Sequence, residues 1–419
     1  MNHGAKRAVV RVAIAPSGTS PLAVLGVLAV LGALAAVLSA CTGASSAFGD
    51  KGRSPREAIL VTPRDGARGV GPDDRVEVRV PEGRLESVGV TRIEDAQERR
   101  VPGRIARDGR SWTSSGAGAT GRLGLAARYR VDAVAVDGEG HRVVRRTTFT
   151  TAVPEHRFTG RVTPENRSTV GTGMIVSVTF SRPVVNRAAV ERAVEVTSVP
   201  AVEVVGHWFG AGRLDFRPAA YWAPGTEVTV RTRMRDIEGA PGVYGSQDGT
   251  VAFRVGRSQT SLVDVAAHTM KVHRDGQLVA TVPITAGRPG SDTYNGRMVV
   301  GEMHEAIRAD GRAVDCGRER DGGGIPHALR LTGSGVLLHG DHWSGEGVFG
   351  AANVGRRCVG LRDARGGGSD TPAGWFFDRT LVGDVIEVVN SRGGRVAPHD
   401  GLGGWNLGWT KWKAGSALR

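Results

Sequence analysis

The stretch SLVDVAAHTMKVHRDGQLVATVPITAG, residues 261–287, places two largely apolar runs on either side of Asp275-Gly276. An Asp-Gly pair between two such runs is a strong hairpin signal, because both central residues of the favoured two-residue turn adopt positive φ. The stretch therefore predicts two antiparallel strands. Further strand candidates follow at GRMVVGEM, GVLLHG and DVIEVVNS. SDTPAGWFFDRT predicts a short helix, with Asp370 or Thr371 as N-cap and Pro372 in the first turn.

Composition extends this prediction to the whole chain. The 419 residues are 40% hydrophobic, which is enough for two to four domains with cores of their own. The chain contains 62 glycines, only 5% aromatic residues and many short valine-rich runs. This combination favours strands and turns over helix bundles, so we expect a mainly β fold.

Two similar modules precede the hairpin. TPRDGARGVGPDDRVEVRV (62–80) and TPENRSTVGTGMIVSVTF (163–180) share a Thr-Pro opening, a polar turn and an alternating strand. The two segments predict tandem immunoglobulin-like β-sandwich domains at residues 56–153 and 156–257. A β-rich domain with a little helix follows at residues 258–390.

The N-terminal 40 residues have the features of an export signal. Lys6, Arg7 and Arg11 precede the apolar run PLAVLGVLAVLGALAAVLSAC. Leu38-Ser39-Ala40-Cys41 resembles the bacterial lipobox, in which cleavage leaves a cysteine that carries lipid. A retained transmembrane helix is the alternative, and both tether the chain to a membrane. Residues 41–55 are small and polar, which predicts a flexible tether.

The formal net charge of +13 raises the question of a nucleic-acid partner. The sequence contains no helix-turn-helix or RNA-binding signature, and an exported lipoprotein rarely meets DNA. Anionic cell-wall polymer is a more natural partner for a basic chain outside the cytoplasm.

An aromatic cluster in the second module has two interpretations. It is a platform for glycan stacking, or it fills the core of the sandwich or a seam between domains. The structural interpretation is favoured, because aromatics in strand-like runs usually pack inside a sandwich. The cluster comprises Trp208, Phe209, Phe216, Tyr221 and Trp222.

The stretch LLHGDHWSGEGVFGAANVGRRCVGL, residues 337–361, contains the candidate catalytic pair. Cys358 is one of three cysteines, and His339 is the nearest plausible base in sequence. A thiol with an ordinary pKa of about 8.5 needs a base or positive surroundings to react as thiolate. The glycine-rich segment 345–355 can bring backbone amides close to a substrate carbonyl. The alternative is that Cys358 is a small buried core residue.

These stretches together resemble the catalytic domain of an L,D-transpeptidase of the actinobacterial type. The resemblance covers residues 261–300, 337–361 and 374–391, and it continues through GWNLGWTKWKAGSAL in the C-terminal extension, residues 391–419. In that family the same order follows one or two immunoglobulin-like domains and a lipoprotein signal. The resemblance implies that the enzyme cross-links peptidoglycan, that carbapenem-type compounds inhibit it, and that it needs no metal or organic cofactor.

The resemblance also implies a mechanism. Cys358 attacks the carbonyl of the third residue of a tetrapeptide stem, releases D-alanine and forms a thioester, which an amine of a second stem resolves. His339 takes the proton first from the thiol and then from the amine. Residues implied to contact the substrate are His342, Trp343, Asn353, Gly355, Arg356 and Arg357.

The chain departs from the family pattern immediately before the cysteine. Family members usually carry Ser-His-Gly there, and this chain carries Gly355-Arg356-Arg357. An arginine in place of glycine distorts the oxyanion pocket if φ there must be positive. The two guanidinium groups instead favour a lower thiol pKa.

Several alternatives remain open from the sequence. His304, His327 and His342 with His339 suggest a metal site, but no zinc-binding spacing accompanies them, so we expect none. Cys316 either pairs with Cys358, which would block catalysis, or pairs with a partner, or stays free. An L,D-carboxypeptidase and a non-catalytic wall-binding lipoprotein are the competing functions. In each case we expect the protein at the outer face of the cytoplasmic membrane.

Overall fold

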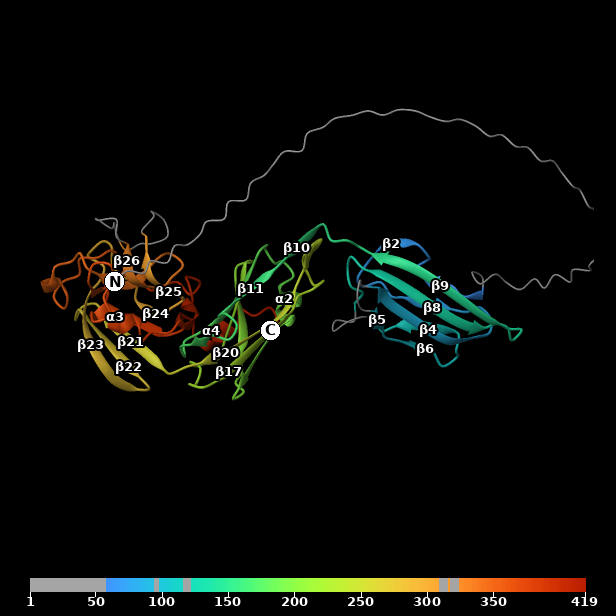
Figure 1. The fold of residues 1–419 in the computed structure, drawn as a ribbon, viewed down its shortest axis with the longest axis horizontal. Coiled ribbons are helices and arrows are strands. Elements are labelled where there is room, and N and C mark those ends of the chain that lie inside the picture. The colour runs from blue at the N-terminus through green and yellow to red at the C-terminus, as the bar shows by residue number, and fades with distance from the viewer. Residues whose placement is uncertain (1–57, 94–97, 116–121, 309–315, 317–323) are drawn as a thin grey trace, which may run out of the picture. The chain divides into compact units, whose positions relative to one another are not determined.

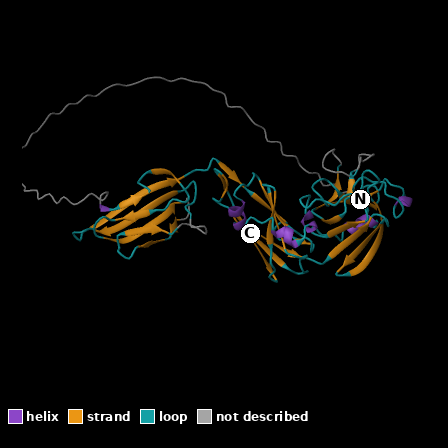
Figure 2. Cartoon of the chain, turned by 180° about the vertical axis from the view of Figure 1, so that it is seen from behind, coloured by secondary structure: helices purple, strands orange, loops and turns teal. Residues whose placement is uncertain are grey.

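A computed structural model of the protein describes residues 58–93, 98–115, 122–308, 316 and 324–419. Strands dominate this part of the chain, and its few helices are short (Figure 2). The strands form three groups of sheets that follow one another in sequence (Figure 1). The predicted mainly β fold is therefore confirmed. The predicted signal segment and tether, with Cys41, lie outside the described residues.

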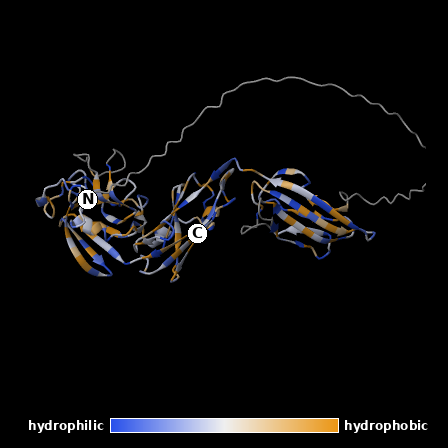
Figure 3. Ribbon diagram, in the orientation of Figure 1, coloured by the Kyte–Doolittle hydropathy of each residue, from blue (hydrophilic) through white to orange (hydrophobic). Residues whose placement is uncertain are grey.

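The first group of strands forms two sheets around one core. In β8 the side chains alternate between buried and partly exposed positions, and Figure 3 shows this alternation as bands of opposite hydropathy along the strands. The core includes Val78 and Trp112 of one sheet and Tyr129 and Val131 of the other. One sheet has the order β1 (Leu60–Thr62), β3 (Glu77–Arg79), β7 (Ser111–Ser114), β6 (Gly103–Ile105), and the other β2 (Ala67–Val70), β9 (Arg142–Thr151), β8 (Arg128–Val136), β4 (Arg84–Ile93), β5 (Glu98–Val101).

The second group forms another sandwich with a small additional sheet. One sheet has the order β11 (Gly160–Thr163), β13 (Val176–Phe180), β16 (Arg213–Arg217), β15 (Val205–Phe209), and the other β12 (Thr169–Val170), β20 (Asp248–Val255), β17 (Glu227–Arg233), β14 (Val194–Val199). The small sheet has the order β10 (His156–Phe158), β19 (Val243–Gly245), β18 (Glu238–Ala240), and the helix α2 spans Arg187–Arg192. Buried residues of both large sheets, including Val178 and Val230, share one core.

The third group is a single nine-stranded sheet. Its order is β24 (Gly296–Val299), β29 (Val385–Val389), β21 (Gln259–Asp264), β22 (Thr269–Arg274), β23 (Gln277–Thr285), β28 (Val359–Arg362), β27 (Leu337–Asp341), β26 (Ile325–Arg330), β25 (Glu302–Ile307). Short helices lie between or after these strands: η1 (Glu346–Val348), α3 (Pro372–Phe377), η2 (Gly403–Asn406) and α4 (Trp409–Lys413). Helix α3 contacts β26, β27 and β28, so it packs beside the strands that carry the candidate site.

Both local predictions for this domain are confirmed. Strands β22 and β23 pair antiparallel with Arg274 opposite Gln277, and the turn residues Asp275 and Gly276 have φ of 49° and 82°. Helix α3 begins after Thr371, whose side chain accepts a hydrogen bond from the backbone N–H of Gly374, and Pro372 occupies the first turn.

The aromatic cluster of the second sandwich packs inside the protein. Trp208, Phe216 and Trp222 are buried in a core that also takes in Trp405 and Trp412 from the C-terminal segment. The Trp412 indole N–H donates to the Val205 carbonyl at 2.9 Å. The structural interpretation of the cluster is therefore confirmed, and the C-terminal segment completes the core of a domain far upstream in sequence.

Arg217 lies at the centre of this aromatic packing. Its guanidinium carbon is 4.5 Å from the Trp405 ring centroid and 4.4 Å from that of Trp412. The guanidinium donates to the carbonyls of Pro218, Gly404 and Leu407, so one buried cation links β16 to the C-terminal segment. Burial lowers the pKa of Arg217 to about 10, which leaves it charged at neutral pH.

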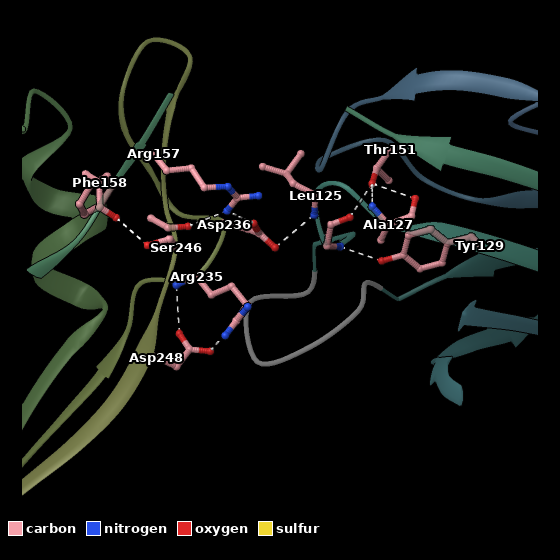
Figure 4. A network of polar contacts seen from close by, with 12 residues as sticks. Leu125, Ala127, Tyr129, Thr151, Arg157, Phe158, Arg235, Asp236, Ser246 and Asp248 are labelled. Atoms are coloured by element: carbon pink, nitrogen blue, oxygen red, sulfur yellow. Dashed lines mark hydrogen bonds and ion pairs between the residues drawn. The ribbon is translucent and has the colours of Figure 1, made fainter. Parts of the chain in front are cut away.

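Polar contacts also fix the connecting segments of both sandwiches (Figure 4). In the first, the Tyr129 hydroxyl accepts from the backbone N–H of Gly124 at 2.8 Å. In the second, Arg157 contacts Asp236 at 3.3 Å. Among the described residues, the structure contains no helix of the length and apolarity needed to span a membrane.

Candidate active site

The pairing of two neighbouring strands brings Cys358 close to His339. Strands β27 and β28 are parallel, with Leu338 opposite Val359 and His339 opposite Gly360. Cys358 immediately precedes β28, and its sulfur lies 3.3 Å from the backbone nitrogen of Leu337. His339 therefore lies in the middle of a strand. Both segments are apolar because they form central strands of a buried sheet.

His339 is placed to act as a neutral base. The imidazole is only 4% exposed, and its Nδ1 lies 2.9 Å from the Gly340 carbonyl, which can only accept. The proton is thus on Nδ1 and the lone pair on Nε2. Burial lowers the pKa of His339, while the hydrogen bond to Gly340 and the carboxylates of Asp341 and Asp363 act in the opposite direction.

The structure also decides the question of Cys316, which the sequence left open. Cys316 and Cys358 form a disulfide with a Cα–Cα distance of 5.0 Å. A ring nitrogen of His339 and the two sulfur atoms all lie within 4.8 Å of one another. Cys358 is 2% exposed, and in this state its sulfur is not a thiol. The nucleophile and base predicted from sequence are together, but the nucleophile is blocked.

Aromatic rings cover the histidine. The Trp343 ring stacks on His339 at a centroid distance of 5.5 Å. Trp343 itself is partly open to solvent, with 38% of the residue exposed. His342 meets the edge of Trp343 at 4.9 Å, and its buried Nδ1 has no hydrogen-bond partner among the described residues. The Trp343 ring thus lies beside the candidate base, and His342 lies beside Trp343.

The two arginines before the cysteine have different surroundings. Arg356 is exposed. Arg357 has a φ of 25°, and its guanidinium donates to the Tyr294 hydroxyl and lies 5.3 Å from the centroid of that ring. A positive φ favours glycine, so Arg357 occupies a backbone position that an arginine rarely adopts.

The backbone amides next to the cysteine are used inside the fold. The N–H of Gly355 donates to the Ala286 carbonyl and that of Arg357 to the Ser291 carbonyl, each at 2.9 Å, and that of Cys358 donates to the Arg356 carbonyl. Asn353 is similarly engaged, since its side-chain oxygen contacts His268 and the N–H of Ala286, and its amide donates to Val265. Asn353 therefore acts as a scaffold for the loop in this state.

Sequence reasoning missed two carboxylates that support the site. Asp341 is buried and accepts from the backbone N–H groups of Trp343 and Ser344, which fixes the turn after β27. Asp363 pairs with His327 at 2.7 Å and accepts from the Thr371 hydroxyl. A signal for Asp341 was present, because an aspartate two and three residues before those N–H groups is typical of an Asx turn.

Two of the histidines that the sequence raised as metal ligands have other partners. His327 pairs with Asp363, and His304 contacts Glu302 at 3.2 Å on the surface. Of the described residues near the site, Cys316, His339 and Cys358 lie close enough together to share an ion. Their two sulfur atoms are bonded to each other, so the site as it stands offers no thiolate ligand.

The described residues thus place a buried cysteine–histidine pair in a sheet that follows two β-sandwiches in the sequence. A family model described as the L,D-transpeptidase catalytic domain matches residues 258–388, and one described as a bacterial Ig domain matches residues 67–238. The chain is 31% identical to L,D-transpeptidase 2 of Mycobacterium tuberculosis (strain CDC 1551 / Oshkosh) over 366 residues, which are 87% of this chain and 85% of that protein. The chain therefore belongs to the L,D-transpeptidase family and is an enzyme of the acyltransferase class.

Other relatives have the same activity in their names. L,D-transpeptidase 5 of Mycobacterium tuberculosis (strain ATCC 25618 / H37Rv) is 28% identical over 91% of this chain and 82% of its own length. The solved structure of the L,D-transpeptidase LdtMt1 in complex with imipenem is 30% identical and matches 55% of this chain and 97% of that chain, with a TM-score of 0.44. Crystalline L,D-transpeptidase 3 from Mycobacterium tuberculosis, with a faropenem-derived adduct, is 25% identical with a TM-score of 0.42 and the same coverages.

Proposed function

We propose that this enzyme cross-links the third residues of peptidoglycan stem peptides through a thioester on Cys358. The observation that carries the proposal is the parallel pairing of β27 with β28, which places the Cys358 sulfur within 4.8 Å of a ring nitrogen of a buried histidine. A neutral imidazole next to a cysteine is the arrangement that activates a thiol for acyl transfer. The family membership of the chain supports the same reaction.

The reaction begins from the reduced enzyme. Nε2 of His339 takes the proton of Cys358, and the thiolate attacks the carbonyl carbon of the third residue of a tetrapeptide donor. The tetrahedral intermediate collapses, the amide bond breaks, and D-alanine leaves with the proton that His339 held. A side-chain amine of a second stem then attacks the thioester, gives its proton to His339, and releases the Cys358 sulfur as the new amide forms.

The neighbouring side chains have roles that follow from their positions. Trp343 presents an open aromatic face next to His339, which suits the apolar parts of a stem peptide. The unpartnered Nδ1 of His342 is available to a polar group of the donor. Arg356 is exposed beside the cysteine and suits the carboxylates of the stems. Asp341 holds the turn that carries both rings.

A carbapenem tests this proposal, because it is an acylating agent that resembles the donor amide and because imipenem is bound in a solved relative. After reduction with a dithiol, the wild-type protein should gain the mass of one drug molecule, and peptide mapping should place it on Cys358. The adduct should be absent from Cys358→Ala. It should form at least about 100-fold more slowly in His339→Ala, a typical contribution of a general base.

A non-catalytic wall-binding protein is the second candidate, and specific observations favour it. Cys358 is buried in a disulfide, and the nearby N–H groups of Gly355, Arg357 and Cys358 are all occupied. A reduced wild type that stays unmodified by the drug and does not turn over purified muropeptides would support this candidate. A variant that combines Gly355→Ser, Arg356→His and Arg357→Gly distinguishes the transpeptidase from the wall-binding protein. If this variant reacts with the drug and the wild type does not, the arginines have closed the site. Release of D-alanine without cross-linked product would indicate an L,D-carboxypeptidase.

We also propose that the mature protein is a lipoprotein anchored through Cys41 at the outer face of the cytoplasmic membrane. The lipobox-like Leu38-Ser39-Ala40-Cys41 after an apolar run supports this proposal, and a peptidoglycan substrate requires the same location. Labelled fatty acid should appear on the wild-type protein and not on Cys41→Ala. Soluble secretion of an unlipidated wild type would contradict the anchor.

A further inference from the structure

We propose that Cys316 is a redox partner of the nucleophile, and that the Cys316–Cys358 disulfide is a reversible lock that a dithiol opens. The inhibitory meaning of the lock rests on the proposed function, since only a nucleophilic Cys358 has activity to lose. The bond itself does not depend on that function. Of the three cysteines in the sequence, the two that pair are the proposed nucleophile and a residue 42 positions before it.

The surroundings of the disulfide are those of a built-in pair rather than an accidental surface contact. Cys316 is 8% exposed and Cys358 2%. Both belong to a small apolar cluster with Ile325, Ala328 and Leu337, which lie on β26 and β27 of the catalytic sheet. The Gly335 carbonyl lies 3.9 Å from each sulfur. Packed apolar neighbours hold the two sulfur atoms at bonding distance, which favours closure of the pair.

Two requirements of acyl transfer are missing from the oxidised protein. Cys358 in a disulfide has no proton for His339 to take, and its sulfur is not a nucleophile. The N–H of Cys358 donates to the Arg356 carbonyl, so this backbone donor is also turned away from a substrate oxyanion. The oxidised protein is therefore an inactive form with its catalytic histidine already in position.

The same site is arranged to open the lock. A thiolate of an external dithiol attacks the sulfur of Cys316, the more exposed of the two, and the S–S bond breaks with its electron pair on Cys358. The Leu337 N–H, 3.3 Å from that sulfur, stabilises the leaving thiolate. The second thiol of the reductant then attacks the mixed disulfide on Cys316.

This exchange balances without any further reactant. The dithiol loses two electrons and becomes a cyclic disulfide, while its two protons pass to the two cysteines. Closing is the reverse reaction with an external disulfide as the oxidant. The neutral His339 imidazole serves the closing direction, because the Cys358 thiol must lose its proton to a base before its sulfur attacks a disulfide.

The test uses the full chain purified without reductant and compares it with Cys316→Ser and Cys316→Ala. Differential alkylation and peptide mass mapping should find Cys316 and Cys358 blocked in the wild type and both free after treatment with a dithiol. The carbapenem adduct on Cys358 should be absent from the oxidised wild type and present after reduction. Both Cys316 variants should form it without reductant, at a rate that reduction does not change.

Two outcomes would overturn the proposal. The first is a wild type whose Cys358 stays alkylatable after equilibration with a small-molecule disulfide. The second is a folded Cys316 variant that still needs a dithiol before Cys358 reacts. Cys41→Ser is the matched control, since the variant removes a cysteine outside the pair and should leave both results unchanged.

The alkylation results separate this proposal from the proposed function. If iodoacetamide labels Cys358 only after reduction in the wild type and without reduction in Cys316→Ser, the lock exists whatever the carbapenem does. If those reduced thiols then remain unacylated by the drug, the transpeptidase mechanism fails and the redox pair stands. Reoxidation with a small-molecule disulfide should return the wild type, and neither variant, to the unreactive form.

Discussion

His339 combines deep burial with a hydrogen bond that fixes its tautomer, and these two features determine the pH at which it changes charge. Burial disfavours the imidazolium, so its pKa lies below the ordinary value of 6.5. In the oxidised wild type, imidazole NMR signals of His339 should therefore report the neutral form at pH 6.5 and change only as the pH falls further. Asp341→Asn should lower the pKa of His339 again, because the Asp341 carboxylate raises it.

The lowered pKa of His339 also makes the stability of the folded protein depend on pH. The unfolded chain binds a proton at this histidine below about pH 6.5, and the folded chain resists it, so the shift costs the folded state stability as the pH falls below that value. Urea midpoints should show this loss in the wild type and a smaller loss in His339→Gln. A His339 that titrates above 6.5 in the oxidised protein would contradict both expectations.

At the scale of the element, the first turn of helix α3 is connected to the partly buried His327–Asp363 pair. The Thr371 hydroxyl accepts from the N–H of Gly374 at 3.1 Å and lies 2.8 Å from Asp363, which pairs with His327. Thr371→Ala should lower the free energy of unfolding by about 1–2 kcal/mol, because the helix loses its cap. Urea denaturation checks the value, and Thr371→Ser, which keeps the hydroxyl, should stay within about 0.5 kcal/mol of wild type. Equal effects of the two variants would assign the loss to the methyl group instead.

Elements with a local signal were predictable from the sequence, and contacts between distant elements were not. The turn at Asp275-Gly276 and the cap at Thr371 depend on neighbouring residues, and both were predicted. Arg217 is one of many arginines in the sequence, and its partners in the C-terminal segment are far away along the chain. The carbonyls of Gly404 and Leu407 that accept its hydrogen bonds lie 187 and 190 residues further on. Nothing near it in sequence marks it as buried.

In the candidate site, too, residues with a local signal were predictable from the sequence and contacts between distant residues were not. Cys358 and His339 were identified from the stretch that contains both, and the structure brings them together through the β27–β28 register. The bond from Cys316 was one of three open alternatives, since pairing of cysteines requires a Cα distance that sequence spacing does not give. The contacts of Asn353 could not be predicted either, because its partners include Val265 and His268, in the turn between β21 and β22.

At the scale of the molecule, Arg217 links the second sandwich to the C-terminal segment. Arg217→Met should lower the free energy of unfolding by about 3 kcal/mol, because three carbonyls lose a donor and the tryptophans lose a cation. Tryptophan fluorescence during urea denaturation and limited proteolysis near residue 404 measure the effect. The matched control is Arg161→Met, which changes an exposed arginine on β11 of the same sheet and should stay within about 0.5 kcal/mol of wild type. Similar losses in both variants would show that Arg217 has no special role.

Because Trp405 and Trp412 complete this core, they also determine when the second sandwich can finish folding during synthesis. Domains are usually complete in the order in which the chain emerges, N-terminal first. Here the second sandwich lacks Trp412, which is fully buried at 0% exposure in the finished core, until the entire catalytic domain has been made. The ribosome therefore releases the catalytic sheet while the core of the domain before it is still incomplete.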